Sequence, residues 1–453
     1  MMAMLSAAAE FVNGTLLGTD RLFDGVCTDT RSLKSGELFV ALKGPNFDGA
    51  DYVQAAAYSG AAGALVAQKT GDDLAQITVD DTRLALGRLG AAWRRQHSAL
   101  VVGITGSNGK TTLKELTAAC LKTSAQTLAT EGNLNNDIGM PLMMTRINES
   151  HRYVVLEMGA NHAGEIAYLA ALAEPDVVAI TNAGAAHLEG FGSIEGVAHA
   201  KGEILGGAHR PGVAVLNADD SYFDLWKKLA GDSDIVSFGL GESADVFASH
   251  VKSDSGGSGF QLHLPSGAVD VRLSLPGGHN VRNACAAAAI ATAIGIAPEQ
   301  IQAGLESVRP VSGRLQPLAG LHGSSLFDDS YNANPLSVAA AAEFLASLGG
   351  TGILVLGDMG ELGNDSVRLH REVGAVAKRA GVSRLYATGE LSKNIVNEFG
   401  QGAYWFGSVD ALIEALRRAV TADANVLVKG SRFMRMERVI QKLVATGKQR
   451  ESA

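Results

Sequence analysis

Short apolar runs alternate with helical segments along the middle of the chain. The runs are ALVVGIT (99–105), RYVVLEM (152–158), DVVAITN (176–182) and GVAVLN (212–217), and a helix is expected from about Thr111. Strands that are buried on both faces of a sheet have this continuous apolar character, because helices cover both faces. We therefore predict a mainly parallel sheet with helices on each side for the middle of the chain.

The same alternation begins again after a Pro/Gly interruption, VRPVSG, at residues 308–313. The second series consists of SLFDDSYN (325–332), a helix from Pro335, TGILVLGDMG (351–360), a helix over Val367–Ala380, RLYATG (384–389) and NVLVKGS (425–431). Strands and helices in this order are typical of an open, doubly wound sheet. The pattern predicts a C-terminal Rossmann-like domain.

In the first part of the chain the expected strands and helices are shorter than in the other two parts. Strands are expected at 37–42 (ELFVAL) and 63–67 (GALVA), with a helix over Tyr52–Ser59 between them. A further helix over Arg83–Gln96 leads into the middle region. The fold class that we predict is α/β with three domains. They are a small mixed α/β domain at 1–82, a central mainly parallel domain at 83–310 and a Rossmann-like domain at 311–453.

Length and charge agree with this division and exclude some functions. The 453 residues correspond to about three domains of ~150 residues each. The 38 Lys and Arg against 47 Asp and Glu give a net charge of −9, which argues against a nucleic-acid-binding protein. An anionic ligand is still compatible with this charge, because local backbone N–H groups can hold a phosphate.

Cysteine usage and hydropathy point to the cytoplasm. Cys27, Cys120 and Cys285 are spaced too widely for a zinc site or a disulfide framework, so we expect reduced thiols. The N-terminus lacks a basic segment before its short apolar stretch, and the longest weakly polar run, 284–297, is too short to span a bilayer. We expect no membrane insertion, and we interpret residues 284–297 as a packed interior helix.

The sharpest motif is GITGSNGKTT at Gly103–Thr112, between a buried strand and a helix. Glycines allow the backbone to wrap a phosphate chain, a lysine neutralises the β- and γ-phosphates, and the next hydroxyl can bind Mg²⁺. The strict P-loop spacing fails by one residue, because Ile104 occupies the position of the first glycine. The residues expected to bind ATP in this loop are Gly106, Ser107, Asn108, Gly109, Lys110, Thr111 and Thr112.

This variant loop resembles that of the Mur ligases and folylpolyglutamate synthetases, which are ATP-dependent amide-forming ligases. The resemblance implies catalytic and metal-binding roles for Glu157 in VVLEMGAN, His187 in TNAGAAHLEG and Lys201 in AHAKGEI, beside Lys110 and Thr111. It implies two Mg²⁺ ions and a carbamate on Lys201, which would supply a hard oxygen ligand. The alternative for Lys201 is a surface lysine paired with Glu203 or Glu195.

The resemblance continues in the second half of the chain. Asn280 in GGHNVRNA matches the adenine-side segment, and Arg314 in SGRLQ is expected to reach the nucleotide phosphates. Asp329 in DDSYNANP is expected at the ribose hydroxyls, with Tyr331 and Asn332 beside it as substrate-binding residues. These positions occur in the order of the family, which gives them more weight together than any one has alone.

The N-terminal segment TDTRSLKSGELFVALKGPNFDGADYV resembles the UDP-sugar-binding domain of the ligases that add the third amino acid and the terminal dipeptide. The substrate-binding candidates from this segment and from GNLNND are Thr30, Arg31, Lys43, Gly44, Phe47, Asp48, Asn135 and Asn136. The spellings DDSYNANP, LGDMGELG and KGSRFMRMERVI resemble the member that adds the dipeptide. The substrates implied are UDP-N-acetylmuramoyl-tripeptide and D-alanyl-D-alanine, joined through an acyl phosphate.

Other functions remain open at this level. Within the family the alternatives are the third-residue ligase and a folylpolyglutamate synthetase, although the latter would lack the TDTR…FVALKG domain. A different class is a P-loop ATPase that couples hydrolysis to motion or assembly, and the plainest alternative is a non-catalytic nucleotide-binding scaffold. The chain is expected to act as a monomer. The sequence leaves open whether diaminopimelate or lysine is the third residue of the tripeptide.

Overall fold

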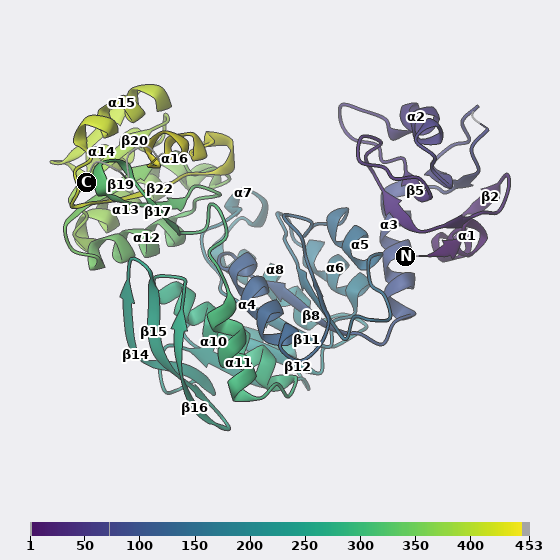
Figure 1. The fold of residues 1–453 in the computed structure, drawn as a ribbon, viewed down its shortest axis with the longest axis horizontal. Helices are drawn as coiled ribbons and strands as arrows, with labels where there is room; N and C mark the ends of the chain where they lie inside the picture. Colours follow the sequence, from purple (N-terminus) through teal and green to yellow (C-terminus); the bar gives the residue numbers. More distant parts are fainter. Residues whose placement is uncertain (1, 72, 446–453) are drawn as a thin grey trace.

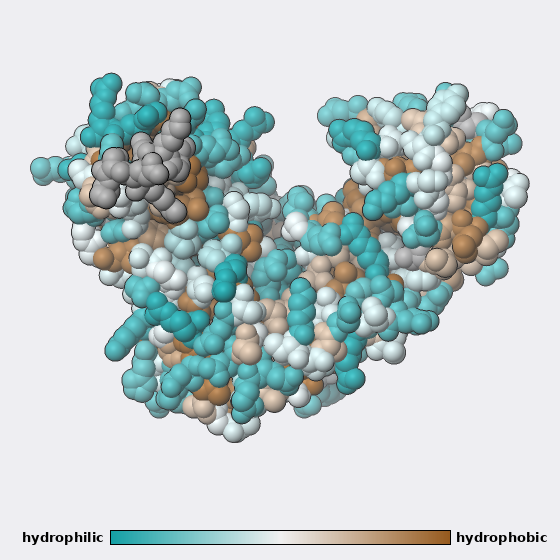
Figure 2. Space-filling model, viewed as in Figure 1, coloured by the Kyte–Doolittle hydropathy of each residue, from teal (hydrophilic) through white to brown (hydrophobic). Residues whose placement is uncertain are grey.

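The computed structural model describes residues 2–71 and 73–445, and it contains three larger sheets in succession along the chain. In Figure 1 the N-terminal sheet (purple) and the C-terminal sheet (green to yellow) lie at opposite upper corners, with the middle sheet between and below them. The space-filling view shows a deep notch between the two outer lobes (Figure 2). The predicted three-domain α/β architecture is confirmed.

The N-terminal domain contains a five-stranded sheet in the order β2-β7-β6-β5-β4. Its elements are β1 (Ala3–Met4), α1 (Leu5–Val12), β2 (Thr15–Leu17), β3 (Leu22–Phe23), β4 (Gly25–Cys27), β5 (Glu37–Val40), α2 (Val53–Tyr58), β6 (Gly63–Val66) and β7 (Gln76–Thr78). The two predicted strands are present as β5 and β6. The helix predicted from Tyr52 begins at Val53, after the 3-10 turn Gly49–Tyr52 that Asp48 caps.

Helix α3 (Thr82–Arg95) connects the first two domains. Asp81 begins it by accepting hydrogen bonds from the N–H groups of Arg83 and Leu84, which would otherwise lack partners. Leu86 and Leu89 of α3 pack into the N-terminal core, whereas Ala91 belongs to a core of the middle domain. One helix therefore takes part in both domains, and a boundary at residue 82 stays a prediction.

The middle domain is built on a nine-stranded sheet in the order β16-β15-β14-β13-β12-β11-β8-β10-β9. Its strands are β8 (Leu100–Thr105), β9 (Thr127–Ala129), β10 (Tyr153–Glu157), β11 (Val177–Ile180), β12 (Val213–Asn217), β13 (Asp234–Gly239), β14 (Val246–Asp254), β15 (Gly257–Leu264) and β16 (Gly267–Leu273). Strands β8 to β13 pair in parallel, as predicted, so their carboxyl ends meet at one edge.

The antiparallel extension β14-β15-β16 is not predicted from the sequence. Buried and more exposed positions alternate along β15, because helices cover only one of its faces. The continuous apolar run that reveals β8 or β11 is therefore missing here. This extension enlarges the platform under helix α10 without contributing any of the predicted site residues.

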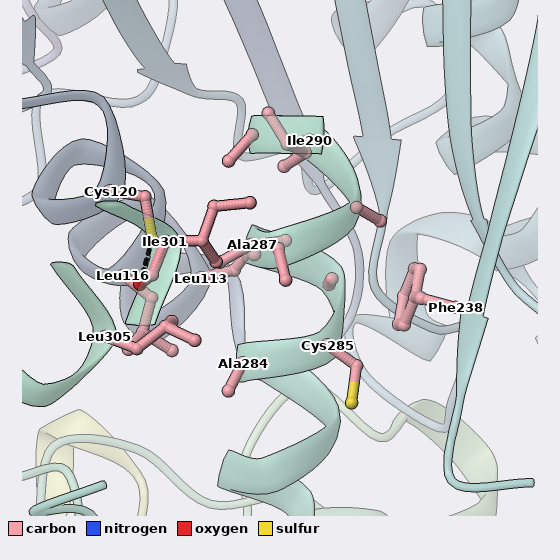
Figure 3. Close-up of a cluster of buried hydrophobic side chains, with 14 of the residues drawn as sticks. Leu113, Leu116, Cys120, Phe238, Ala284, Cys285, Ala287, Ile290, Ile301 and Leu305 are labelled. Atoms are coloured by element: carbon pink, nitrogen blue, oxygen red, sulfur yellow. Dashed lines mark hydrogen bonds between the residues drawn. The ribbon is translucent and has the colours of Figure 1, made fainter. Parts of the chain in front are cut away.

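Helices cover the middle sheet on both faces. They are α4 (Lys110–Lys122), α5 (Gly139–Met144), α6 (Glu165–Ala173), α7 (Leu188–Phe191), α8 (Ile194–Gly202), α9 (Phe223–Ala230), α10 (Gly278–Ala293) and α11 (Pro298–Ser307). In Figure 3, Ala284, Ala287 and Ile290 of α10 lie among apolar side chains of α4 and α11. Residues 284–291 are buried, as predicted, but the helix ends at Ala293 and Gly295 and Ala297 are exposed, so the interior helix is shorter than the predicted 284–297.

The C-terminal domain contains a six-stranded sheet in the order β17-β18-β22-β19-β20-β21, parallel except for the edge strand β17. Its elements are β17 (Gln316–Ala319), β18 (Ser325–Asp329), α12 (Pro335–Ser347), β19 (Thr351–Leu356), α13 (Ser366–Ala380), β20 (Arg384–Thr388), α14 (Ser392–Phe399), β21 (Ala403–Phe406), α15 (Val409–Ala419), β22 (Ala424–Lys429) and α16 (Glu437–Leu443). Leu188 of α7 belongs to the same apolar cluster as Met359 and Leu362, so the middle and C-terminal domains are packed together.

Within residues 2–71 and 73–445, every helix is too short or too polar to cross a bilayer. Charged and polar side chains dominate the face in Figure 2, with apolar atoms in small scattered groups. Cys120 and Cys285 are buried thiols and Cys27 is partly exposed, and all three are unpaired. The unpaired thiols agree with the reduced state expected from their spacing.

Candidate active site

A cavity of about 1040 Å³ lies where the middle and C-terminal domains meet. The carboxyl ends of β8, β10 and β11 open into it from one side, and the end of β18 opens into it from the other. The predicted site residues that line it are Ser107, Asn108, Gly109, Lys110, Thr111, Thr112, Asn135, Asn136, Glu157, His187, Asn280, Arg314, Asp329, Tyr331 and Asn332. The fold thus gathers side chains from both domains around one space.

The phosphate loop has a backbone shape that only glycine accommodates at two positions. Gly106 has φ +142°, and a Cβ there would clash with the Thr181 hydroxyl; Gly106 itself lies behind the residues described as lining the cavity. Gly109 has φ +83° and precedes helix α4, where a Cβ would come within 2.6 Å of the Asn283 side chain. Thr181, which excludes a side chain at position 106, also donates a hydrogen bond to the Asn108 carbonyl and so helps to hold the loop.

Residues after strand β11 hold the phosphate loop from one side. Asn182 accepts a hydrogen bond of 3.0 Å from the Asn108 N–H, and the Thr181 hydroxyl donates to the Asn108 carbonyl at 2.6 Å. The Gly184 N–H donates to the Ser107 hydroxyl at 3.0 Å. Because these contacts fix the loop from outside, the free N–H groups at the start of the thirteen-residue helix α4 can face a phosphate.

Lys110 folds back over this loop. Its Nζ donates to the Gly106 carbonyl at 2.6 Å, and burial lowers the pKa of the amine, with the Arg314 charge adding to the effect and Glu157 opposing it. A lysine in this position supplies a positive charge at the phosphate loop, where it can stabilise the charge on a phosphoryl group. An anion with several phosphates would replace the carbonyl as its partner.

Glu157 ends strand β10 and is 2% exposed. Its Oε1 accepts a hydrogen bond of 2.8 Å from Asn135, whereas its buried Oε2 has no hydrogen-bond partner within residues 2–71 and 73–445. A buried carboxylate oxygen without a partner is costly, and a cation is the group that relieves it best. Glu157 therefore has the chemistry of a ligand for a hard metal ion.

His187 meets a residue of the C-terminal domain at the edge of the cavity. Its Nδ1 lies 2.6 Å from Oε2 of Glu361, and this contact lowers the pKa of the Glu361 carboxyl. The backbone of both residues is left-handed, with φ +55° at His187 and +59° at Glu361. Such conformations are unfavourable for residues other than glycine, so the surrounding packing must impose them.

Lys201 is buried rather than on the surface. The residue is 1% exposed, its Nζ lies 5.1 Å from the Phe191 ring and 3.5 Å from the Ala160 carbonyl, and burial lowers its pKa to about 7. The alternative of a surface lysine paired with Glu203 or Glu195 is therefore wrong. Lys201 itself stands behind Ala160 and is not among the described residues that line the cavity.

Glu203, the partner considered for Lys201, has a different role. Its carboxylate accepts hydrogen bonds from the N–H groups of Gly164 and Ala167, at 2.7 and 3.1 Å. These donors belong to the first turn of helix α6, where a carboxylate is well placed against the helix dipole. Glu203 therefore caps a helix.

Four further predicted nucleotide or substrate residues line the cavity, three from the C-terminal domain and Asn280 from helix α10 of the middle domain. The Arg314 guanidinium stacks on the Tyr331 ring at 4.0 Å and donates to the Thr111 hydroxyl at 3.4 Å. Asp329 pairs with Lys429 at 2.8 Å, and the Asn280 amide donates to the Pro276 carbonyl at 2.8 Å. Arg314 thus links the C-terminal domain to the hydroxyl that follows Lys110.

The six N-terminal candidates form a separate group. Arg31 pairs with its neighbour Asp29 at 2.6 Å, and Lys43 pairs with Asp48 at 3.1 Å, both at exposed positions. Gly44 approaches the Phe47 ring so closely that a Cβ would clash with it. Thr30, Arg31, Lys43, Gly44, Phe47 and Asp48 all lie outside the set of described residues that line the cavity.

Several lining residues were not predicted. They are Asn182, Asp220, His279, Asn334 and Glu361, together with other side chains around the same space. His279 stands next to Asn280 in GGHNVRN, and Asn334 stands in DDSYNANP, so both were within motifs that the sequence analysis had already singled out. Asn182 stands in TNAGAAHLEG and Glu361 in LGDMGELG, so these two also lie within segments that the sequence analysis had singled out, whereas Asp220 lies outside them.

Among the residues that the structure describes, no three His, Cys, Asp or Glu side chains come together as a ready-made metal site. Mg²⁺ does not require one, because it commonly takes one or two protein ligands together with water and substrate phosphates. The buried, unpartnered Oε2 of Glu157 is therefore compatible with Mg²⁺ bound beside a nucleotide.

A phosphate loop beneath a second doubly wound domain defines a nucleotide-binding α/β enzyme. Residues 104–291 match the Mur ligase middle domain, and residues 313–432 match the Mur ligase, glutamate ligase domain. The chain belongs to the Mur ligase family. The UDP-N-acetylmuramoyl-tripeptide--D-alanyl-D-alanine ligase of Escherichia coli is 44% identical to it over 446 residues, covering 98% of each chain.

Solved structures of relatives agree with this assignment. A crystal structure of MurF from Acinetobacter baumannii matches with a TM-score of 0.92 at 36% identity, over 97% of this chain and 98% of that one. MurF ligase from Thermotoga maritima in complex with ADP matches with a TM-score of 0.82 at 28% identity, over 92% of this chain and 96% of that one. The similarity extends over all three domains.

Proposed function

We propose that the protein joins D-alanyl-D-alanine to UDP-N-acetylmuramoyl-tripeptide at the expense of ATP. The observation that carries the proposal is the identity of 44% to an E. coli ligase of that name over 98% of both chains. Two observations support ATP as the nucleotide. A relative has been solved in complex with ADP, and the loop before Lys110 has the backbone shape that only glycine accommodates. The sequence motifs DDSYNANP and LGDMGELG favour the dipeptide over a single amino acid as the acceptor.

The reaction proceeds in two displacements. A carboxylate oxygen of the tripeptide attacks the γ-phosphorus of ATP, so that an acyl phosphate forms and ADP leaves. The neutral amine of D-alanyl-D-alanine then attacks the acyl carbon; phosphate leaves, and the nitrogen loses a proton. Lys110 neutralises charge on the transferring phosphoryl group, while Arg314 holds the nucleotide side from the other domain. Positioning does most of the catalytic work.

Mg²⁺ would be held by Glu157 and the Thr111 hydroxyl, with His187 as the ligand for a second ion. When bound, the metal ions neutralise the phosphate oxygens and increase the electrophilicity of the γ-phosphorus. Glu157 fits this role because its Oε2 is buried without a partner, and Asn135 fixes the orientation of the carboxylate through Oε1. An amide that orients a metal ligand in this way is typical of metal sites.

A carbamate on Lys201 is part of the proposal. Carbamylation joins a neutral amine to CO₂ and releases one proton, so it requires an amine that is uncharged at neutral pH. Burial lowers the pKa of Lys201 to about 7, which leaves a large neutral fraction there. The product is a carboxylate-like oxygen pair, close to the Ala160 segment of the cavity wall.

The three domains divide the substrates between them. The N-terminal group around Arg31 and Lys43 would bind the uridine diphosphate, and its separation from the cavity suits a long substrate whose peptide end must reach Lys110. The C-terminal domain would close over nucleotide and dipeptide, which keeps the acyl phosphate from water. We infer a cytoplasmic location, to which the three unpaired thiols are suited.

Phosphate release with a panel of acceptors tests the proposal. With ATP and UDP-N-acetylmuramoyl-tripeptide, we expect D-alanyl-D-alanine to support turnover, while diaminopimelate, lysine and glutamate do not. Faster extension of a UDP-muramoyl-dipeptide by one amino acid would instead identify the third-residue ligase. ATP hydrolysis at an undiminished rate without any acceptor would point to the other class, an ATPase coupled to motion or assembly.

A further inference from the structure

One cation in the cavity wall lies apart from the phosphate loop and the C-terminal domain. Among the described residues that line the cavity, the Lys and Arg side chains are Arg83, Lys110, Arg282, Arg314 and Lys429. The last four come from the start of α4, from α10 and from the C-terminal domain. Arg83 stands in the first turn of α3, the helix that connects the N-terminal domain to the middle domain. It is therefore the cation on the side of the N-terminal domain.

Arg83 is paired with Asp137, which also lines the cavity. Nε of the guanidinium donates to Oδ2 of the carboxylate, and the two side chains are 57% and 27% exposed. Within residues 2–71 and 73–445, Nη1 and Nη2 of Arg83 and Oδ1 of Asp137 have no hydrogen-bond partner. The N–H groups of Nη1 and Nη2 together can bind a carboxylate, and a carboxylate oxygen can accept from an ammonium. The pair therefore offers a cationic and an anionic group to the same cavity.

The elements around this pair are held in place. Helix α3 packs on α5 and α6, as Figure 1 shows. The Tyr168 hydroxyl of α6 lies so close to Gly87, one turn after Arg83, that a Cβ at Gly87 would clash with it. The loop before α5 is fixed by Asn136, whose side-chain oxygen accepts a hydrogen bond of 2.8 Å from the Gly139 N–H. The positions of both charged groups are therefore set by packing.

The loop that carries Asp137 also reaches Glu157. Asn135 donates to Oε1 of Glu157 at 2.8 Å, and Asp137 follows Asn135 by two residues. Two residues of a chain span at most about 7 Å. In diaminopimelate, three methylene groups separate the two amino-acid ends, which is about 5 Å for C–C bonds of ~1.5 Å. A diaminopimelate whose first carboxylate reacts beside Glu157 therefore has the length to reach Asp137 with its second end.

We propose that Arg83 and Asp137 form a specificity subsite for the third residue of the tripeptide, and that the subsite selects a side chain ending in both an ammonium and a carboxylate. Diaminopimelate has such a side chain. Arg83 binds its carboxylate, and Asp137 binds its ammonium. Lysine has the same side chain without the second carboxylate, so its ammonium would lie beside a guanidinium that lacks its anion. The inference rests on the proposed function, because it assigns a part of that reaction's substrate.

The same helix offers a matched control. Arg95, at the end of α3, pairs with Glu174 at 2.6 Å, and these side chains are 56% and 25% exposed, much like Arg83 and Asp137. Arg95 and Glu174 lie outside the set of described residues that line the cavity. Arg95→Gln therefore removes an equivalent ion pair between α3 and the middle domain. Arg83→Gln removes an ion pair and, in addition, the proposed partner of the substrate carboxylate.

The test compares two UDP-N-acetylmuramoyl-tripeptides that differ only in the third residue, diaminopimelate or lysine. Phosphate release with saturating ATP and D-alanyl-D-alanine gives kcat/KM for each, and their ratio does not depend on how much of a variant is folded. We expect the wild type and Arg95→Gln to favour the diaminopimelate form by about tenfold, the usual worth of a hydrogen bond to a charged group. Arg83→Gln should lose this preference through a lower value for the diaminopimelate form alone. Asp137→Asn should lower both values, because both side chains carry the ammonium.

Three results would overturn the proposal. The first is a wild type that uses both forms equally well. The second is an equal loss for both forms in Arg83→Gln, which would place the guanidinium at a group that the two substrates share. The third is an Asp137→Asn enzyme with wild-type values. A wild type that extends neither tripeptide would overturn the proposed function together with this inference, whereas the first three results leave the ligase activity intact.

Discussion

The side-chain amide of Asn334 donates a hydrogen bond of 2.8 Å to Oδ1 of Asn108, so the start of helix α12 is bonded directly to the phosphate loop. Asn334 also caps that helix, because its own oxygen accepts from the Ser337 N–H at 2.9 Å. One amide therefore uses its oxygen inside the C-terminal domain and its nitrogen across the domain boundary.

These two functions of Asn334 can be separated by substitution. Serine retains a cap but cannot reach Asn108, and alanine loses both. We expect Asn334→Ala to lower the free energy of unfolding by about 0.5–2 kcal/mol, and Asn334→Ser to change it little. Both should raise the KM for ATP severalfold, because the loop loses its outer contact. Urea unfolding and steady-state kinetics measure the two effects. Equal KM values in all three proteins would contradict the role assigned to the contact.

Lys110→Ala should abolish ligation without unfolding the protein. The amine supplies the positive charge at the phosphate loop, and the removal of such a preorganised group typically costs about 10²–10³ in kcat. Exposed Lys122, at the end of the same helix, provides the control variant Lys122→Ala. Phosphate release and circular dichroism are the measurements. A well-folded Lys110→Ala with normal turnover would show that Gly103–Thr112 is not the catalytic loop.

Lys201→Ala should lose activity and recover part of it with small carboxylates. If the lysine acts as a carbamate, the variant lacks an anionic oxygen group that acetate or formate can replace in the vacated space. Small amines should give no rescue, because the missing group is an anion. The assay is phosphate release with increasing concentrations of each additive. Rescue by amines, or near-normal activity of Lys201→Ala alone, would show that the residue is not a metal-binding carbamate.

Stability should fall below neutral pH partly because of His370. Its Nε2 accepts a hydrogen bond from the Met359 N–H, and its Nδ1 lies 2.6 Å from the Ser366 carbonyl. These contacts stabilise the neutral form of the ring in the folded protein. Burial lowers its pKa below the ordinary value of about 6.5. The unfolded chain therefore takes up more protons, and the stability that depends on the neutral ring is lost as pH falls from about 6.5 through the folded pKa.

The measurement is the free energy of urea unfolding between pH 7.5 and pH 5, compared with that of His370→Gln, which cannot titrate at this position. We expect the wild type to lose more stability than the variant on acidification. Other histidines and carboxylates contribute equally to both proteins, so the difference isolates this ring. Parallel pH dependences would show that His370 is protonated in the folded state without cost.

The sequence predicts those parts of the fold in which local pattern and burial agree. Strands β8 and β11 are continuous apolar runs, and glycine at 106 and 109 is required by left-handed backbone, so both the sheet and its loop could be located in advance. Strands β14 to β16 and the short β7 lack such runs. Whether these segments form strands depends on which of their faces a helix covers, and the tertiary structure decides that rather than the local sequence.

The candidate site divides in the same way. Lys110, Glu157 and Arg314 stand in motifs whose spacing is local, and the structure places all three on one cavity. The burial of Lys201 could not be predicted, because Glu203 nearby made a surface ion pair equally plausible. The contact of His187 with Glu361 joins two domains, and neither loop carries a pattern that points to the other.

Helix α3 has a practical consequence for anyone who recombines this protein with a relative. Because Leu86 and Leu89 complete one core and Ala91 belongs to the next, a crossover placed at residue 82 would give a hybrid whose helix fits only one of its two neighbours. A junction at His97 or Ser98, beyond the end of the helix, would transfer α3 intact but would then require matched partners in α5 and α6. At this end of the chain, the N-terminal domain can therefore be exchanged only together with α3 and the surface of α5 and α6 that α3 contacts.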